Sequence, residues 1–259
     1  MIECRNLSYK ISGKTIVDSA TLSARDGEIT VILGKNGSGK TTLIRAITAP
    51  AEHRKHIDGE VRLSGEDALS LTSRELASRI SLVPQILPGI RCSVTDLVSL
   101  ALLADRSPFS RLDDQGRRAV SDAIASVGLE PLADSSVASL SGGERQLAYI
   151  AMMMAKGAQN LVLDEPTSAL DSLNREAVLA FLRKMKAKGR AVLAVLQDIN
   201  DAVAIADRIV VIDRGRVIFD GTPEMLEKSD VPTDHFGLMP CRVNSGEEQF
   251  VAYFPKKQS

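Results

Sequence analysis

Four short apolar runs, each ended by a glycine or a polar residue, dominate the hydrophobic pattern of this chain. They are "EITVILG" at 28–34, "NLVLDEP" at 160–166, "AVLAVLQ" at 191–197 and "RIVVID" at 208–213. Apolar residues at helical spacing follow the first run in "KTTLIRAITA". Buried runs of strand length that alternate with helical segments predict an α/β fold with a mostly parallel sheet covered on both faces.

The segments between these runs divide the chain. "DRGRVIFDG" predicts a hairpin that turns at Gly215. Strand-like runs vanish between about 93 and 156, where "SVTDLVSLALLA" and "DDQGRRAVSDAIASVGL" carry helical patterns. We therefore expect an α/β core at 1–92 and 157–225, an inserted helical subdomain at 93–156, and a C-terminal extension at 226–259 whose structure the pattern leaves open.

Composition narrows the function classes. Of 259 residues, 44% are apolar and 25% are charged, which is typical of a globular protein in water. A net charge of −1, no tryptophan and 3% aromatic residues argue against nucleic-acid binding by bulk charge or base stacking. No apolar run approaches the ~18 residues of a membrane span, so any membrane role must come through a partner. The three cysteines and three histidines form no ligand pattern, and we expect reduced thiols in the cytosol.

The strongest candidate for chemistry is "GKNGSGKT" at 34–41, which matches the G-x-x-x-x-G-K-[ST] pattern of a phosphate-binding loop. Its glycines let the backbone curl so that amide groups face phosphate oxygens, and the following helix start adds positive potential. Lys40 is expected to reach the β- and γ-phosphates, and the Thr41 hydroxyl to ligate Mg²⁺.

A second candidate site lies at the end of "LVLDEP". Asp164 and Glu165 follow a buried strand, at the edge where open α/β sheets bind ligands. Asp164 suits Mg²⁺, which prefers oxygen ligands. Glu165 would project elsewhere and be free to polarise an attacking water.

"LSGGERQ" at 140–146 supplies another anion-binding helix start. Two phosphate-binding helix starts for one nucleotide are redundant unless two chains face each other and each completes the other's site. That arrangement is found in ABC-transporter ATPases, and the chain resembles this family over most of its length. "LSGGERQ" is similar to the family's signature motif, and "SALD" at 168–171 is similar to the loop that crosses the dimer.

The resemblance implies a fold and a set of site residues. The fold is that of a P-loop NTPase of the ABC ATPase type, with a mostly parallel sheet core, an N-terminal antiparallel β portion and the inserted helical subdomain. It also implies that Tyr9 stacks on adenine, and that Gln85 senses Mg²⁺ and the transmembrane partner. The expected catalytic residues are Glu165, Lys40 and Gln197, and the expected metal ligands are Thr41, Gln85 and Asp164. The residues expected to bind ATP are Tyr9, Gly34, Lys35, Asn36, Gly37, Ser38, Gly39, Lys40, Thr41, Thr42, Gln85, Ser141, Gly142, Gly143, Glu144 and Asp171.

The branch of the family is indicated by longer segments. Residues 59–85, 93–109 and 196–226 are similar to the ATPases of importers for iron-siderophores, haem and cobalamin. The resemblance implies a homodimer at the cytoplasmic face of the membrane, two permease subunits as partners, and a periplasmic or extracellular binding protein that acts indirectly. A molybdate or other oxyanion importer with the same architecture stays open.

Gln197 is the clear departure from the family pattern, which usually has a γ-phosphate-contacting histidine at this position. An amide can donate a hydrogen bond to phosphate, but it cannot carry a positive charge or shuttle a proton near neutral pH. Two explanations stay open: a native variant in which Glu165 drives hydrolysis, or an introduced substitution that slows it. The remaining interpretation is structural: Gln197 is a polar residue at the end of a strand and has no role in the reaction.

Two further function classes are kept beside the transport ATPase. One is an ATP-gated assembly factor without a permease, as in iron–sulfur cluster assembly, which the permease-facing segment after Gln85 argues against. The other is a catalytically weak binding subunit, supported by Gln197 alone and opposed by the intact Lys40, Asp164 and Glu165.

Overall fold

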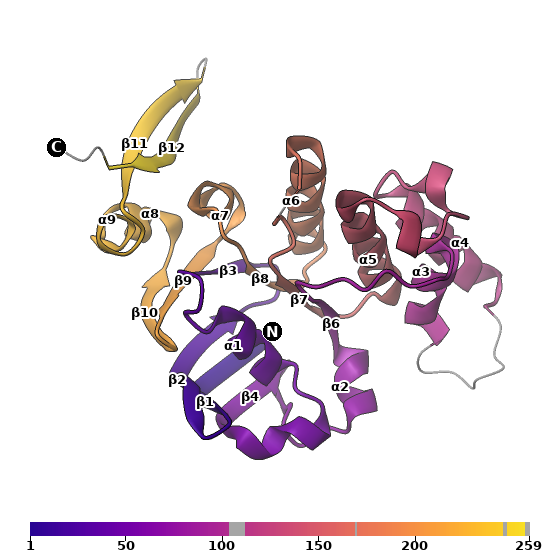
Figure 1. Ribbon diagram of the computed structural model, residues 1–259, viewed down its shortest axis with the longest axis horizontal. Helices are drawn as coiled ribbons and strands as arrows, with labels where there is room; N and C mark the ends of the chain where they lie inside the picture. Colours follow the sequence, from indigo (N-terminus) through magenta and orange to yellow (C-terminus); the bar gives the residue numbers. More distant parts are fainter. Residues whose placement is uncertain (104–111, 169, 246–247, 257–259) are drawn as a thin grey trace.

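The structure of the protein is a computed structural model, which describes residues 1–103, 112–168, 170–245 and 248–256. A six-stranded sheet lies at its centre (Figure 1). In spatial order its strands are β10 (Arg216–Gly221), β9 (Arg208–Asp213), β3 (Ile29–Leu33), β8 (Ala191–Val195), β7 (Asn160–Asp164) and β6 (Ile80–Val83). Neighbours from β9 to β6 pair in parallel, and β10 pairs antiparallel with β9. The prediction of a mostly parallel α/β sheet is confirmed.

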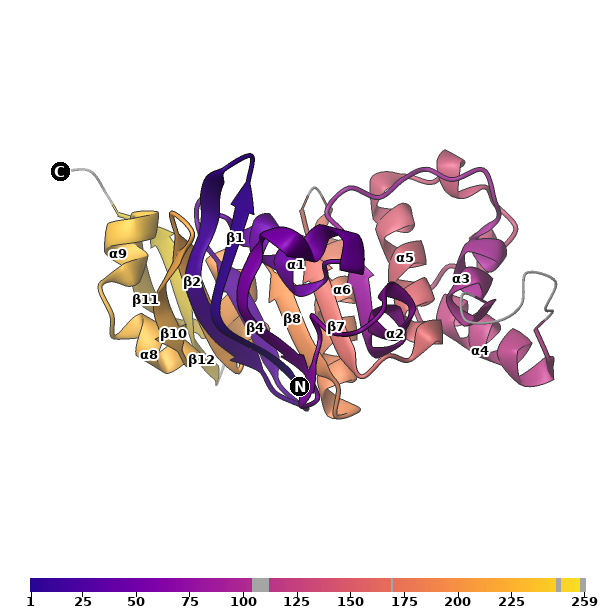
Figure 2. The ribbon, with the colours of Figure 1, turned by 90° about the horizontal axis from the view of Figure 1, so that it is seen from below.

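The N-terminal part of the chain forms a second, antiparallel sheet. Its order is β2-β1-β4-β5, with β1 at Ile2–Ile11, β2 at Lys14–Ala24, β4 at Ile57–Leu63 and β5 at Glu66–Asp67. Figure 2 shows this sheet lying across the central one. The antiparallel N-terminal portion that the family resemblance implied is therefore present.

Alternate residues of the central strands feed two separate cores. Val31 and its counterparts pack with the helices α5 (Gly142–Lys156), α6 (Ser172–Ala187) and α7 (Ile199–Ile205). Ile32 and its counterparts pack with α1 (Lys40–Ile47) and the antiparallel sheet. Both faces of the sheet are thus buried, which explains why its inner strands are apolar at most positions rather than at every second one.

The described residues between 94 and 156 are mainly helical and lie at one end of the molecule (Figures 1 and 2). They contain α3 (Val94–Leu103), α4 (Asp114–Ala125), two short 3₁₀ turns at Glu130–Leu132 and Val137–Ser139, and α5. Residues 104–109 of the segment expected to face a permease lie outside the described residues. The domain limits expected from the sequence stay a prediction.

The C-terminal extension lies at the opposite end of the molecule (Figures 1 and 2). The pattern had left its structure open. α8 (Pro223–Glu227) leads into it, and it contains α9 (Val231–Phe236) and a two-stranded hairpin of β11 (Leu238–Ser245) and β12 (Glu248–Pro255). The remaining helices are α2 (Ser73–Arg79) and a 3₁₀ helix at Ala51–His56. None of the helices in the described part of the chain is long and apolar enough to cross a membrane.

The turn between β9 and β10 lies at Arg214 and Gly215, as predicted, and both residues have positive φ angles. A Cβ atom at Gly215 would lie 2.2 Å from the carbonyl oxygen of Ile16 on β2. Glycine is therefore required here by close backbone packing as well as by the turn.

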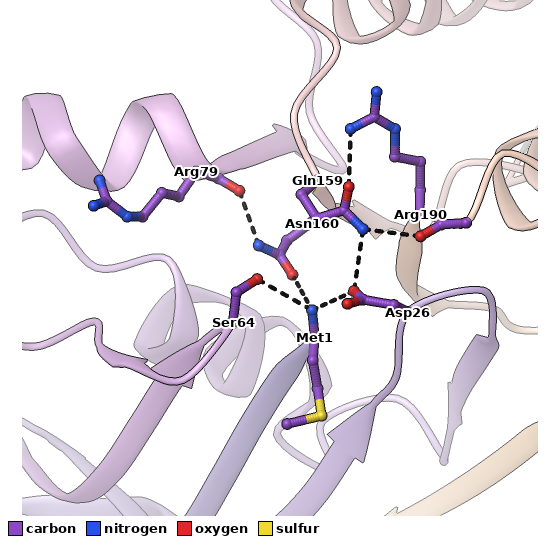
Figure 3. Close-up of polar contacts among 8 residues, drawn as sticks. Met1, Asp26, Ser64, Arg79, Gln159, Asn160 and Arg190 are labelled. Atoms are coloured by element: carbon purple, nitrogen blue, oxygen red, sulfur yellow. Dashed lines mark hydrogen bonds and ion pairs between the residues drawn. The ribbon is translucent and has the colours of Figure 1, made fainter.

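Polar contacts around Met1 join the two sheets (Figure 3). The Asn160 side chain, at the start of β7, accepts a hydrogen bond from the α-amino group of Met1 at 3.0 Å. It also donates to the carbonyl oxygen of Arg79 at 3.0 Å. Asn160 is 1% exposed, so this amide satisfies buried polar groups from the N-terminus and from the end of α2.

We expect Asn160→Ala to lower the free energy of unfolding by about 1–3 kcal/mol, because it leaves two polar groups without their amide partner. Urea denaturation followed by circular dichroism measures the change. Ser64→Ala is the matched control, since the Ser64 hydroxyl lies 3.4 Å from the same amino group at an exposed site. Its effect should stay within about 0.5 kcal/mol. Equal losses in both variants would contradict the role given to Asn160.

Candidate functional site

Four neighbouring parallel strands bring the sequence-predicted residues together at one edge of the sheet. Because β3, β8, β7 and β6 are adjacent and parallel, their carboxyl ends meet at the same edge. The glycine-rich loop follows β3, Gln197 follows β8, Asp164 ends β7, and Gln85 follows β6. These segments are far apart in the sequence and become neighbours through the strand order.

A cavity of about 420 Å³ opens at this edge. Its walls are formed by Ile16, Asn36, Gly37, Gly39, Lys40, Thr41, Thr42, Gln85, Glu165 and Gln197. All of these residues except Ile16 were predicted as site residues. Ile16 gave no signal in the sequence, because an isoleucine in a strand usually indicates packing.

The glycine-rich loop fits tightly against the neighbouring hairpin. A Cβ atom at Gly34, whose φ is 155°, would lie 2.3 Å from the carbonyl oxygen of Ile212. The loop closes over the Lys40 side chain, whose Nζ donates to the carbonyl oxygens of Gly34 at 2.7 Å and Lys35 at 3.1 Å. The ammonium group of Lys40 is therefore held inside the loop and beside the cavity.

Burial shifts the titration of Lys40. Loss of hydration lowers the pKa of Lys40, while the nearby charges of Glu165 and Asp164 act in the opposite direction. Lys40 is 5% exposed and lines the cavity, so its ammonium group lies at the cavity wall. An anion that enters the cavity would stabilise the charged form.

Thr41 and Asp164 form a pair of oxygen donors at the start of α1. The Thr41 hydroxyl donates to Oδ1 of Asp164 at 3.3 Å. Asp164 is 3% exposed, and its burial raises its pKa, an effect that the Thr41 hydrogen bond partly offsets. The pair presents a hydroxyl and a carboxylate side by side, which is a suitable oxygen set for a hard cation.

Glu165 has a backbone conformation that non-glycine residues rarely adopt, with φ at 53°. Backbone hydrogen bonds hold this conformation. The Glu165 N–H donates to the carbonyl oxygen of Val195 at 3.1 Å, and the Glu165 carbonyl oxygen accepts from the Ser168 hydroxyl at 2.9 Å. From this strained backbone the Glu165 side chain lines the cavity.

The Glu165 carboxylate accepts hydrogen bonds from both predicted glutamines. Gln85 Nε2 donates to Oε2 at 2.8 Å, and Gln197 Nε2 donates to the same oxygen. Glu165 is 7% exposed, so the two amides supply partners for a carboxylate that has lost most of its water. Gln85, Glu165 and Gln197 thus form one hydrogen-bonded unit from three strand ends.

The turn that carries Gln197 is held by an ionic network that the sequence analysis missed. Arg175 on α6 contacts Asp198 Oδ2 at 2.9 Å through Nη2, and it donates to Asp201 Oδ1 at 2.8 Å through Nε. Asp198 also caps the N-terminus of α7. Separate charged residues on two helices carry no sequence signal of pairing, so only the packing of α6 against α7 reveals this support.

The remaining predicted residues lie outside this cavity. Ser141 and Glu144 form a reciprocal capping box at the start of α5, with Gly142 and Gly143 between them. Asp171 caps α6 by accepting from the N–H of Asn174, and Ala169 of the "SALD" segment lies outside the described residues. Tyr9, on β1, is partly buried and packs against the core of the antiparallel sheet. The chain alone does not join these residues to the cavity.

Comparison with known proteins connects this geometry to a family. The family model described as "ABC transporter" matches residues 17–168. The chain is 32% identical to the petrobactin import ATP-binding protein YclP of Bacillus subtilis, over 88% of this chain and 90% of that protein. It is 32% identical to the hemin import ATP-binding protein HmuV of Shewanella denitrificans, over 89% of this chain and 91% of that protein. A solved metal-chelate-type ABC transporter in an inward-facing conformation superposes with a TM-score of 0.83 at 25% identity, covering 98% of this chain and 96% of that one.

The raised pKa of Asp164 generates a prediction about stability and pH. Between the ordinary carboxyl pKa and the raised one, the folded protein binds more protons than the unfolded chain. The free energy of unfolding therefore falls as pH rises through that window. We expect Asp164→Asn to unfold at higher urea concentration than the wild type at about pH 7, and the difference to shrink toward about pH 4.

Urea midpoints measured across this pH range check the expectation. Asp114→Asn is the matched control, because the Asp114 side chain is 85% exposed. Its midpoint should follow that of the wild type at each pH. If Asp164→Asn were less stable than the wild type at neutral pH, the conclusion that burial of the ionised Asp164 carboxylate destabilises the fold would be wrong.

Proposed function

We propose a transport function for this chain. The chain belongs to the ABC transporter family, as an ATP-binding subunit and ATPase. In this proposal it powers the import of a metal chelate, such as an iron-siderophore, haem or cobalamin, through a partner permease. The observation that carries the proposal is the cavity at the four strand ends, where the loop, the two carboxylates and both glutamines converge. Its relatives include import ATP-binding proteins for petrobactin and for hemin, which supports the class of cargo.

Mg²⁺ fits the oxygen donors of the cavity. Thr41 and Asp164 would hold it, and Gln85, which lines the same cavity, would be a further oxygen ligand. Within the described residues no group of three His, Cys, Asp or Glu side chains could hold a metal, so phosphate and water oxygens would complete the shell. When bound, Mg²⁺ would offset phosphate charge and orient the terminal phosphate.

The glycine-rich loop and Lys40 are assigned to the phosphates of ATP. Gly34 to Thr42 would cradle them with backbone amides, and the hydroxyl groups of Ser38 and Thr42 would add to these contacts. Lys40 already lies inside the loop, so its ammonium group would exchange carbonyl partners for phosphate oxygens with little movement. The same exchange would restore a favourable charge environment to a partly desolvated lysine.

Glu165 is assigned as the general base. Both glutamine amides donate to Oε2, so we assign Oε1 to the attacking water. Two donors on one oxygen fix the carboxylate plane and keep the other oxygen directed into the cavity. Gln197 would then hold Glu165 in place and donate a hydrogen bond to the γ-phosphate. Its amide is neutral and would not transfer a proton.

A second copy of the chain would complete the site. The capped start of α5, with Ser141, Gly142, Gly143 and Glu144, lies apart from the cavity of its own chain. In a head-to-tail homodimer it would face the γ-phosphate held by the other subunit, with Asp171 at the crossing loop. Tyr9 would stack on the adenine ring from the antiparallel sheet.

Two permease subunits at the cytoplasmic face of the membrane are the proposed partners, with a periplasmic or extracellular binding protein acting through them. Ile86, directly after Gln85, is 81% exposed, and Leu100 on α3 is 51% exposed. Apolar side chains this exposed, on the segment linked to the Glu165 unit, suit contact with another protein.

Turnover by variants tests the roles of Glu165 and Gln197. We expect the wild type to hydrolyse ATP, Glu165→Gln to lose about 10²–10⁴-fold in kcat, and Gln197→His to change kcat by less than about tenfold. Phosphate release under saturating Mg²⁺-ATP measures the rates. A nearly inactive wild type that Gln197→His restores would contradict the assignment of Gln197 as a working residue.

Purification from its native cell tests the transport function. The chain should co-purify with a many-helix membrane protein, and mass spectrometry of the complex should detect a metal chelate or its binding protein. An oxyanion cargo would overturn the proposed substrate class. Recovery of the chain with assembly proteins and without any membrane protein would overturn transport itself.

A further inference from the structure

A cleft with no assigned function lies beside the C-terminal hairpin, apart from the cavity of strand ends. Its volume is about 560 Å³, and α7, α8 and β12 form its walls. The lining residues are Asn200, Val203, Ala204, Pro223, Glu224, Glu227, Phe250, Val251, Ala252 and Tyr253. The cleft is therefore bounded by two short helices and by one strand of a two-stranded sheet.

The edge of β12 that faces this cleft is not paired with another strand in the part of the chain that the structure describes. The N–H of Tyr253 points away from β11, because it donates to the Asn200 side chain on α7. Backbone groups of an antiparallel strand alternate between its two edges with a period of two. The N–H and C=O of Val251 therefore point to the same open edge, which explains why Val251 lines the cleft.

The side-chain amide of Asn200 already pairs with the open edge of β12 at Tyr253. Asn200 Oδ1 accepts from the N–H of Tyr253 at 2.7 Å, and Asn200 Nδ2 donates to the carbonyl oxygen of Tyr253 at 3.2 Å. This reciprocal pair is the pattern that a neighbouring strand would make. The Asn200 side chain thus acts as a one-residue strand mimic and leaves the next pairing position, at Val251, facing the cleft.

The walls of the cleft combine apolar surface with negative charge. Val203, Ala204 and Pro223 are apolar, and Phe250 is 48% exposed. Glu224 and Glu227 are three residues apart on α8 and so share one face of it. Glu227 pairs with Arg242 at 3.4 Å, while a hydrogen bond from the Thr222 hydroxyl lowers the pKa of Glu224.

We propose that this cleft binds an extended peptide segment of a partner protein, which adds as a strand to the open edge of β12 and carries basic residues at alternate positions. Backbone pairing at Val251 would supply affinity. Basic side chains on one face of the added strand would meet Glu224 and Glu227, and apolar ones on its other face would cover Val203 and Ala204. The proposal does not depend on the transport function, because no residue of the cleft lines the ATP cavity.

Fluorescence anisotropy of labelled octapeptides with the full-length protein tests this. The probe is (Val-Lys)₄, and the matched probe is (Val-Glu)₄, which has the same strand propensity and the opposite charge. We expect saturable binding of (Val-Lys)₄ that weakens with salt, and at least about tenfold weaker binding of (Val-Glu)₄. A copy of (Val-Lys)₄ with N-methylated valines loses backbone donors and should also bind at least about tenfold more weakly.

Variants of the protein locate the site. Glu224→Gln should weaken (Val-Lys)₄ binding by about 2–10-fold, while Glu176→Gln, an equal charge change on α6, should leave it unchanged. Val251→Pro removes the open-edge N–H and leaves the bonds to β11, so it should weaken binding at least about tenfold with ATP hydrolysis unchanged.

The peptide probes keep the test decisive if Val251→Pro disturbs the hairpin. Equal binding of (Val-Lys)₄ and its N-methylated copy would overturn strand addition. Equal effects of Glu224→Gln and Glu176→Gln would overturn the location. Absence of saturable binding by (Val-Lys)₄ would overturn the proposal as a whole.

Discussion

The Glu165 carboxylate, bonded to amides from two other strand ends, is the interaction on which the arrangement of the site depends. A carboxylate that is 7% exposed needs hydrogen-bond donors, and Gln85 and Gln197 both supply one to Oε2. Those donors can converge only because β6, β7 and β8 are adjacent and parallel. The strand order is thus a chemical requirement as well as a packing solution, and a different order would leave the glutamate buried without partners.

The same edge of the sheet holds groups whose burial opposes their charge. Burial lowers the pKa of Lys40 and raises that of Asp164, so each side chain is kept in surroundings that disfavour its ionised form. A bound nucleotide and its cation would supply the opposite charges that these groups lack. Residues that weaken the isolated fold are therefore the ones that would gain most from binding, which is the usual relation between stability and function at such sites.

Connections run from this edge to both ends of the molecule. Arg175 ties α6 to the turn that follows Gln197, and Asn200, in the first turn of α7, is bonded to the backbone of the C-terminal hairpin. On the opposite side, the segment after Gln85 leads into α3. The helical subdomain and the hairpin are therefore both joined to the surroundings of Glu165 by short stretches of chain and a few specific contacts.

The sequence by itself determined the features that neighbouring residues encode. The loop at 34–41, the strand that ends in Asp164, the turn at Gly215 and the parallel α/β class all follow from short motifs and from periodicity, and the structure contains each of them. The tertiary structure alone decided which distant groups meet. Gln85 and Gln197 reach one oxygen of Glu165 across 80 and 32 residues of chain, Arg175 pairs with Asp198, and Asn200 caps the edge of β12. Such contacts depend on strand order and helix packing, which follow from the burial of the whole apolar surface rather than from any local stretch.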